Sequence, residues 1–422
     1  MKLAFFGYAW SKALQLDAYM TQTLKSLVDT GADVDLYLGS QLSKEFGIYG
    51  LKETVSPSKL AAFIAAQGYD AAIAFNNSML IPEVMGALKG RIATVIVDEP
   101  EHLFDYLGAG PNAVFRQDVE IVAMSSRLER RIVEAIDGVE PRLHFMLPAT
   151  QIDPVARSLT QPRFPISWVA SYVGDLNLDQ YLQLTAERPD FRALTIKCLE
   201  IVERDGDLRS MKLEDGADAA LIRTLPWKFD YFQGQMQNIL TNRDRVAVAE
   251  RLAKHGLALF GNAGWLKLLT HNTAAMRALQ SGPALAGHAE LMGVYNASRV
   301  SINLPQSHVT RDAVQYRVLD VMGSNALMIT LHSDTSDLYR VFGKDCPVPT
   351  YADLDELEAL CLRYLGNEDE RRELVAQCNA LVSSGFSFAE RATDLLRIVG
   401  LKPPKTAAPG AARHVDLGLF AA

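Results

Sequence analysis

The chain has 422 residues, of which 49% are hydrophobic and 22% are charged, a composition typical of a soluble globular protein with two or three domains. A net charge of −8 argues against a nucleic-acid partner. No run of about 18 apolar residues exists, so no transmembrane segment is expected. Four cysteines without metal-like spacing favour a reduced, cytoplasmic setting. The short apolar start, broken by Gly7, predicts a first strand rather than a signal peptide.

Strands and helices alternate through the first 155 residues. Apolar runs predict strands at 2–6, 34–38, 71–75, 92–97, 121–124 and 143–146. Helical spacing of apolar residues predicts helices at 14–30, 57–67, 81–89 and 127–136. This alternation is typical of a parallel, doubly wound sheet. Residues 1–155 are therefore predicted to form a Rossmann-like domain.

A Pro-containing segment, 156–166, is expected to be the linker to a second domain at 167–385. Strands are predicted there at 167–173, 257–260, 300–304 and 326–330, with a long helical insertion over 178–255. The Pro/Ala-rich residues 401–422 predict a mobile tail, with the alternative that 415–420 docks as a short anchor.

Residues 294–330 combine the features of an anion site. The predicted strand at 300–304 stops at Pro305, and a loop rich in side-chain donors follows at 306–310. A helix is expected to start near Asp312, since acidic residues suit a helix N-terminus. Free backbone N–H groups at such a start bind anions, and ligands of open α/β sheets bind at the carboxyl ends of strands.

This stretch also resembles a known family. The strings VYNASRVSINL (294–304), RVLD (317–320) and GSNALMIT (323–330) resemble the C-terminal half of the CgeB-like (spore-coat-protein-like) glycosyltransferases. That family belongs to the group-1 glycosyltransferases. Its usual string is Arg-x-Phe-Glu-x-x-x-x-Gly, and here Leu319, Asp320 and Asn325 replace the aromatic residue, the glutamate and the glycine. The wider group's Glu-x7-Glu spacing appears as Asp312-x7-Asp320.

The resemblance implies an α/β, GT-B-like fold, in which two Rossmann-like doubly wound domains face a cleft. It also implies that a C-terminal helix, 386–400, crosses back to the first domain. The implied activity is that of a hexosyltransferase-like enzyme moving a sugar from a nucleotide-diphosphate donor to an acceptor hydroxyl. The acceptor would be a glycan, a peptide or a small molecule.

No cofactor or metal is expected, because no Asp-x-Asp motif follows a predicted strand and GT-B enzymes typically work without one. Asp33-Val-Asp35 lies at the start of a strand, on the side away from the cleft.

Several residues are candidates for the donor site. Arg311 at the helix start is unfavourable toward the helix dipole unless an anion offsets it, and Arg317 offers a forked set of donors. The resemblance implies that Asp320 holds the ribose and that Asp312 lies near the donor sugar. The alternatives are that Arg317 pairs with acids of its own helix and that His308 is an ordinary loop hydrogen-bonder. The full set is Gly261, Asn262, His308, Arg311, Asp312, Arg317 and Asp320.

A general base is predicted at the end of the strand at 92–97. The acids and imidazole of DEPEH (98–102) are suited to deprotonating an acceptor hydroxyl, and Asp98, Glu99 and His102 are the candidates. The alternative is a solvated loop that caps the next helix. Gly7 and Tyr8, after the first strand, are assigned to the acceptor side, with a simple turn as the alternative for Gly7.

Other functions remain open at this stage. A GT-B-like protein can be a non-catalytic scaffold or a sugar-nucleotide epimerase, and a two-domain α/β protein can bind a small ligand without chemistry. The chain has neither Gly-x4-Gly-Lys-Ser/Thr nor Gly-x-Gly-x-x-Gly after its first strand. The chain therefore lacks the residues that bind phosphate in kinases, ATPases and nicotinamide enzymes.

Overall fold

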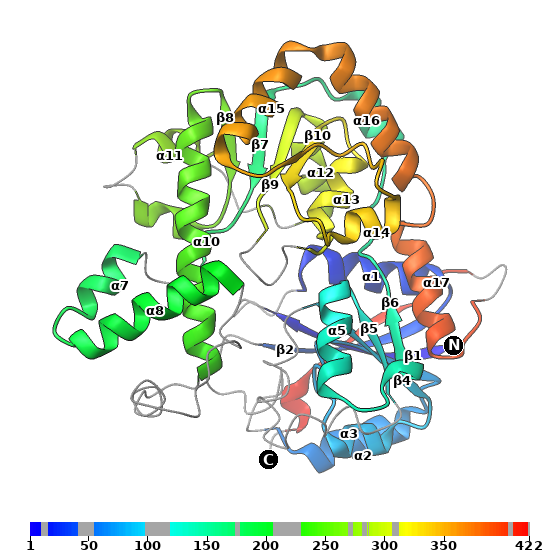
Figure 1. Ribbon diagram of the computed structural model, residues 1–422. Helices are drawn as coiled ribbons and strands as arrows, with labels where there is room; N and C mark the ends of the chain where they lie inside the picture. The colour runs from blue at the N-terminus through cyan, green and yellow to red at the C-terminus, as the bar shows by residue number, and fades with distance from the viewer. Residues whose placement is uncertain are drawn as a thin grey trace.

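The computed structural model describes residues 1–9, 16–40, 55–97, 119–173, 178–205, 229–268, 273–280, 285, 287–305, 312–403 and 408–420. Their strands form two separate parallel sheets, each flanked by helices (Figure 1). The first sheet has seven strands in the order β12-β2-β1-β3-β4-β5-β6, and the second has five in the order β11-β10-β9-β7-β8. The predicted pair of doubly wound α/β domains is therefore confirmed.

The first lobe is built from apolar strands with helices between them. Its strands are β1 (Lys2–Ala9), β2 (Asp33–Ser40), β3 (Ala71–Phe75), β4 (Arg91–Ile96), β5 (Val119–Ala123), β6 (Leu143–Phe145) and β12 (Ala412–Val415). Its helices are α1 (Ala18–Asp29), α2 (Pro57–Gln67), α3 (Pro82–Ala87), α5 (Ser126–Ala135) and the 3-10 turn η1 (Glu140–Arg142). The inner strands β1, β3, β4 and β5 are buried on both faces, as expected for a parallel sheet covered by helices, whereas the edge strands β6 and β12 are half-buried or mostly exposed. The strand order reverses between β1 and β3.

The second lobe repeats this plan with more helices. Its strands are β7 (Phe164–Val169), β8 (Leu257–Phe260), β9 (Ser298–Asn303), β10 (Leu327–Leu331) and β11 (Thr350–Tyr351). Its helical elements are α6 (Pro154–Leu159), α7 (Leu178–Leu184), α8 (Pro189–Asp205), α10 (Phe229–Ala253), η2 (Ala263–Leu268), α11 (Thr273–Ala278), α12 (His288–Asn296), α13 (Tyr316–Met322), α14 (Asp337–Phe342), α15 (Leu354–Gly366) and α16 (Glu368–Val382). The strand order reverses between β7 and β9.

Two features differ in detail from the expected organisation of the second lobe. The predicted linker 156–166 contains most of α6, because Asp153 caps this helix and Pro154 occupies its first turn. It also contains the start of β7, so the second sheet begins earlier than residue 167. The helices α7, α8 and α10 stand to one side of the second sheet (Figure 1) and share a small core around Leu194, Met236 and Leu240.

The last long helix, α17 (Phe388–Ile398), returns to the first lobe. Its residues Ala392, Leu395 and Leu396 are buried in the same core as Leu27 of α1 and the strands of the first sheet. Figure 1 shows α17 beside the first sheet, although the chain reaches it from α16 of the second lobe. The two lobes are thus connected twice, through α6 and through α17.

The C-terminal segment 408–420 differs from the expected mobile tail. Its strand β12 pairs in parallel with β2 and forms one edge of the first sheet. The 3-10 turn η3 (Leu417–Phe420) follows, and Phe420 is buried against Phe63 of α2. Residues 412–420 are therefore docked on the first lobe, as in the alternative of a short anchor at 415–420.

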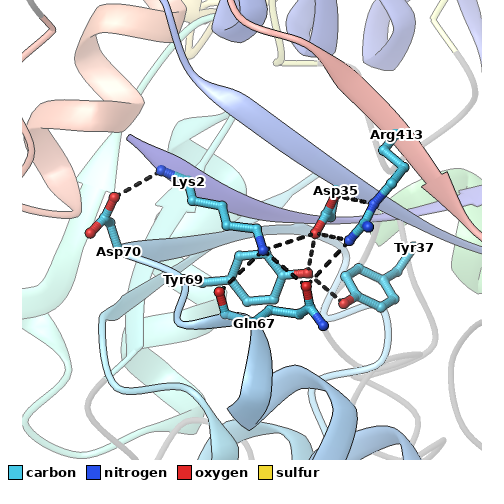
Figure 2. Close-up of polar contacts among 7 residues, drawn as sticks. All are labelled: Lys2, Asp35, Tyr37, Gln67, Tyr69, Asp70 and Arg413. Carbon is cyan, nitrogen blue, oxygen red and sulfur yellow. Dashed lines mark hydrogen bonds and ion pairs between the residues drawn. The ribbon is translucent and has the colours of Figure 1, made fainter.

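A buried carboxylate holds this edge strand in place. Arg413 of β12 donates two hydrogen bonds to Asp35 of β2, at 2.8 and 2.7 Å, and Tyr69 donates a third at 2.6 Å (Figure 2). Lys2 lies 3.8 Å from the same carboxylate. Burial alone would raise the pKa of Asp35, but the hydrogen bonds from Arg413 and Tyr69 hold it below its ordinary value. The Asp35–Arg413 ion pair thus stabilises the docking of the C-terminal segment 408–420 on the first sheet.

We expect Arg413→Ala to loosen the tail while leaving the rest of the first sheet intact. Removing one partner of a buried carboxylate costs roughly 1–3 kcal/mol, and that cost falls on the docking of β12. The backbone amides of 408–420 should therefore lose protection in a hydrogen-exchange measurement. The neighbouring variant His414→Ala, whose side chain is exposed, is the matched control. Equal protection of the tail in both variants would contradict this role of Arg413.

Candidate functional site

The carboxyl ends of the strands of both sheets face each other across the contact between the lobes. In the first lobe, the contact residues follow strand ends: Tyr19 starts α1 after β1, and Ser126 starts α5 after β5. In the second lobe, Asp320 lies on α13 after β9, and Asp337 starts α14 after β10. Because ligands of open α/β sheets bind at these ends, the site is expected where the two sets of loops meet.

Asp320 is at the centre of the first interlobe contact. Its carboxyl group is completely buried and accepts hydrogen bonds from Tyr19 (2.7 Å) and Thr150 (2.7 Å). His288 Nε2 of α12 lies 2.9 Å from Oδ1. The ring of Tyr19 also stacks on Tyr316 at a centroid distance of 3.8 Å. Burial, followed by the charge of Asp320, raises the pKa of Tyr19 well above its ordinary value. The expected ribose role of Asp320 stays a prediction, and in this arrangement the carboxyl group is enclosed by protein.

Asp337 forms the second interlobe contact. It is fully buried and accepts hydrogen bonds from the Ser126 backbone N–H (3.0 Å) and from the Ser126 hydroxyl. A carboxyl group of the second lobe therefore caps helix α5 of the first, where it is favourable to the helix dipole. Burial raises the pKa of Asp337, and the bonds from Ser126 oppose this shift. Arg340 adds a 2.5 Å bond to Glu129.

The predicted donor-site residue Asp312 lies beside this second contact. Its Oδ1 accepts a 2.5 Å hydrogen bond from Ser333, and its Oδ2 is 3.9 Å from Arg130 of α5. Its backbone carbonyl accepts from the Asp337 N–H at 2.7 Å. The structure thus places Asp312 at the lobe boundary, before α13, because the helix that carries Asp320 begins at Tyr316 and not near Asp312 as expected.

Two arginines lie at the carboxyl ends of β7 and β9, where the strand order of the second sheet reverses. Arg317 donates to Asn303, the last residue of β9, at 3.0 Å. Arg245 of α10 is buried and donates through Nη1 to the Ser171 carbonyl, just past the end of β7. Its Nε has no hydrogen-bond acceptor among the described residues. No carboxylate of the described residues lies within 4.0 Å, the limit for an ion pair, of either guanidinium group.

The electrostatics of this arginine pair are unusual for buried cations. Burial, together with the nearby positive charge of Arg317, lowers the pKa of Arg245 to about 9. Buried charges are normally paired with an opposite charge, because desolvation is costly. The pair therefore provides a positive site that is suited to an anion.

Gly261 and Asn262 shape the neighbouring loop. The side chain of Asn262 forms two hydrogen bonds with the Tyr172 backbone: its Nδ2 donates to the carbonyl at 3.0 Å, and its Oδ1 accepts from the N–H at 2.9 Å. A side chain at Gly261 would overlap the Ala170 carbonyl and the Trp265 ring. These two predicted donor-site residues thus hold the loop after β8 against the loop after β7, close to Ser171.

Gly7 and Tyr8 lie inside β1, which continues to Ala9, so the turn considered for Gly7 is absent. The Tyr8 hydroxyl accepts a 2.8 Å hydrogen bond from Asn76 Nδ2. Asn76 and Asn77 follow β3 with left-handed φ values of 47° and 56°. Backbone strain of this kind is often found at functional sites, and this turn lies where the first sheet reverses its strand order.

Five predicted site residues lie outside the described residues: Asp98, Glu99, His102, His308 and Arg311. Conversely, sequence reasoning missed Arg245, Tyr19, His288 and Asp337. Arg245 belongs to a helix that carries Arg243 and Arg251, and no motif distinguishes it from them. Its only signal is a position near the end of the helix that leads into β8.

The described ranges contain neither a cluster of metal-ligating side chains nor a membrane-spanning helix. Within them, no group of three or more His, Cys, Asp or Glu side chains is placed to hold a metal ion. No helix in the same ranges is long and apolar enough to cross a membrane. The four cysteines are free.

The chain is similar to known proteins in part of its sequence and in its fold. The glycosyl transferase-like family model matches residues 242–397, the segment that contains Arg245, Arg317 and Asp320. No curated protein matches the sequence. Sucrose-phosphate synthase from Thermosynechococcus elongatus is 11% identical, with a TM-score of 0.53 over 94% of this chain and 98% of that chain. WaaG, a glycosyltransferase involved in lipopolysaccharide biosynthesis, is 11% identical, with a TM-score of 0.51 over 93% and 99%.

At this level of identity the solved structures show the fold alone. The two lobes have the GT-B fold, as the sequence resemblance implied. The family match supports the glycosyltransferase part of that resemblance over the second lobe.

We expect Asp320→Asn to destabilise the protein by about 1–3 kcal/mol, because a buried hydrogen-bond network loses an acceptor that serves both lobes. Urea unfolding is the measurement. Asp334→Asn makes the same chemical change at a side chain that is 97% exposed and is the matched control. A variant at Asp320 as stable as this control would show that the interlobe network contributes nothing.

Proposed function

We propose that the protein is a glycosyltransferase that moves a sugar from a nucleoside-diphosphate donor to an acceptor hydroxyl without a metal ion. The GT-B fold and the family match over residues 242–397 support this proposal. We further propose that it is a hexosyltransferase of the CgeB-like group, for which the strings at 294–304 and 317–330 are the support.

The observation that carries the proposal is the arginine pair. Arg245 and Arg317 present two guanidinium groups at the point where the second sheet reverses its strand order, and no described carboxylate forms an ion pair with either. A diphosphate has the negative charge that these groups lack and offers oxygen acceptors to their remaining N–H donors, and guanidinium forks match its geometry. Arg311 would join them from the adjoining loop.

The same arginine side chains would also stabilise charge that develops during the reaction. The bond between the sugar and the diphosphate breaks with its electron pair going to the leaving diphosphate, which becomes more negative. Fixed cations in a desolvated site stabilise that growing charge. The acceptor oxygen bonds to the sugar carbon and passes its proton to a base, for which we propose Asp98, Glu99 or His102 of the first lobe. Tyr8 and Asn76 lie on that side.

We expect Arg245→Ala to weaken nucleoside-diphosphate binding by roughly 1.5–3 kcal/mol, the range for hydrogen bonds to a charged group. This corresponds to an increase in Kd of about 10- to 150-fold. A thermal-shift screen of UDP, GDP, ADP, CDP and dTDP selects the ligand, and calorimetry then measures its Kd.

Arg243→Ala is the control for this experiment, because Arg243 is on the same helix but forms ion pairs with Glu203 and Asp244. In the wild type, affinity should fall as the pH rises through about 9, where Arg245 loses its proton. A diphosphate that binds equally to both variants would remove Arg245 from the site. Binding of none of the five would contradict the proposed function.

We expect sugar transfer to continue in EDTA, because the leaving charge is balanced by arginines rather than by a metal ion. Release of the nucleoside diphosphate and product analysis with a glycan, peptide or small-molecule acceptor are the measurements, and product analysis also separates transfer from epimerisation. Activity lost in EDTA and restored by Mg²⁺ or Mn²⁺ would overturn metal independence. Full activity of the triple variant Asp98→Ala, Glu99→Ala, His102→Ala would overturn the proposed base.

A further inference from the structure

A pocket of about 800 Å³ lies along β6, at the edge of the first sheet opposite β12. It runs from the start of β4 and β5, at Arg91 and Glu120, to Leu147 beyond the end of β6. Helix α17 forms its other wall, and Val341 of α14 closes one end. The arginine pair at β7 and β9 does not line it, so it is separate from the proposed donor site.

The pocket carries more positive than negative charge. Three arginines, Arg91, Arg391 and Arg397, line it together with two carboxylates, Glu120 and Asp394. Three positive charges against two negative charges leave one positive charge, in a chain whose net charge is −8. An anionic ligand is therefore favoured over a cationic one.

Two of these arginines have donors to spare. Arg91 has one contact with a described carboxylate, Glu120, at 3.4 Å, and Arg397 has one with Asp394, at 2.8 Å. Their side chains are 63% and 72% exposed, and a guanidinium has five N–H donors. Arg391 is more fully occupied, since it bonds both the Leu147 carbonyl (2.9 Å) and Asp394 (3.0 Å). Arg91 and Arg397 are thus the groups available to a ligand.

The pocket also offers a backbone donor and apolar surface. The Met146 N–H donates to the Ala123 carbonyl at 3.1 Å, so the alternation of a strand turns the Phe145 N–H away from β5 and toward the open edge. Phe145, Phe386 and Ile398 supply hydrophobic lining. A volume of this size is within the range of small-molecule sites, about 300–1,000 Å³.

We propose that this pocket binds a small organic anion, with its phosphate, carboxylate or sulfonate group at Arg91 and Arg397 and its apolar body against Phe145, Phe386 and Ile398. The pocket is lined by both lobes, because Val341 belongs to the second lobe while β6 belongs to the first. This site is independent of the donor site and does not rest on the proposed glycosyl transfer.

The test uses 8-anilinonaphthalene-1-sulfonate, which joins a sulfonate to an apolar body and fluoresces when it is bound in an apolar site. The full-length protein should show saturable binding of one equivalent at low salt, unchanged by excess UDP. The double variant Arg91→Gln, Arg397→Gln should weaken this binding by at least about tenfold, because both anion contacts are lost. Inorganic phosphate should displace the probe only weakly, since it lacks the apolar body.

The control is Arg299→Gln, Arg372→Gln, which removes two exposed arginines of the second lobe and makes the same change in net charge. Matching melting temperatures of the two double variants establish that both are folded. Equal probe affinity in the two variants would overturn the proposal. So would displacement of the probe by UDP, or phosphate binding as tight as that of the probe.

Discussion

The structure depends on the burial of one carboxyl group, that of Asp320, between the two lobes. A buried carboxyl group is costly unless its hydrogen-bonding capacity is used, and here donors come from three separate segments: Tyr19 of α1, Thr150 before α6 and His288 of α12. The lobes therefore satisfy Asp320 only in a narrow range of relative positions. Asp337, buried at the start of α5, imposes a second constraint of the same kind.

These constraints bring the carboxyl ends of both sheets together. Arg245 and Arg317 lie at those ends without a carboxylate partner among the described residues. Other charges of the described chain form compensated groups in places; Glu358, for example, is held by Arg251, Lys254 and His255. Arg245 is more deeply buried than any of these cations, yet its neighbour is another arginine. A protein gains no stability from such a pair, so the arrangement is better explained by a ligand that completes it.

Much of the fold could be predicted from local pattern, because a buried parallel strand is a short apolar run and an intervening helix has its own period. The site was predicted only in part. Arg317 and Asp320 were found through a string of nearby residues. Arg245 was not, because a charged residue on a helix has the same local pattern whether it faces solvent or the end of a neighbouring strand. The tail shows the same limit, since its docking requires Asp35, which lies 378 residues away from Arg413.

The sequence by itself determined the two-lobed α/β class and the alternation of strands and helices, and it predicts the stretch around 294–330 as a ligand-binding region. These properties follow from apolar periodicity and neighbouring residues, which act over a few turns of chain. Only the tertiary structure decided that Asp320 joins the lobes, that the charge of Arg317 acts on Arg245, that β12 forms an edge of the first sheet and that a charged pocket opens beside β6. Each of these depends on desolvation and charge between segments far apart in sequence, and such energies exist only once the chain is folded.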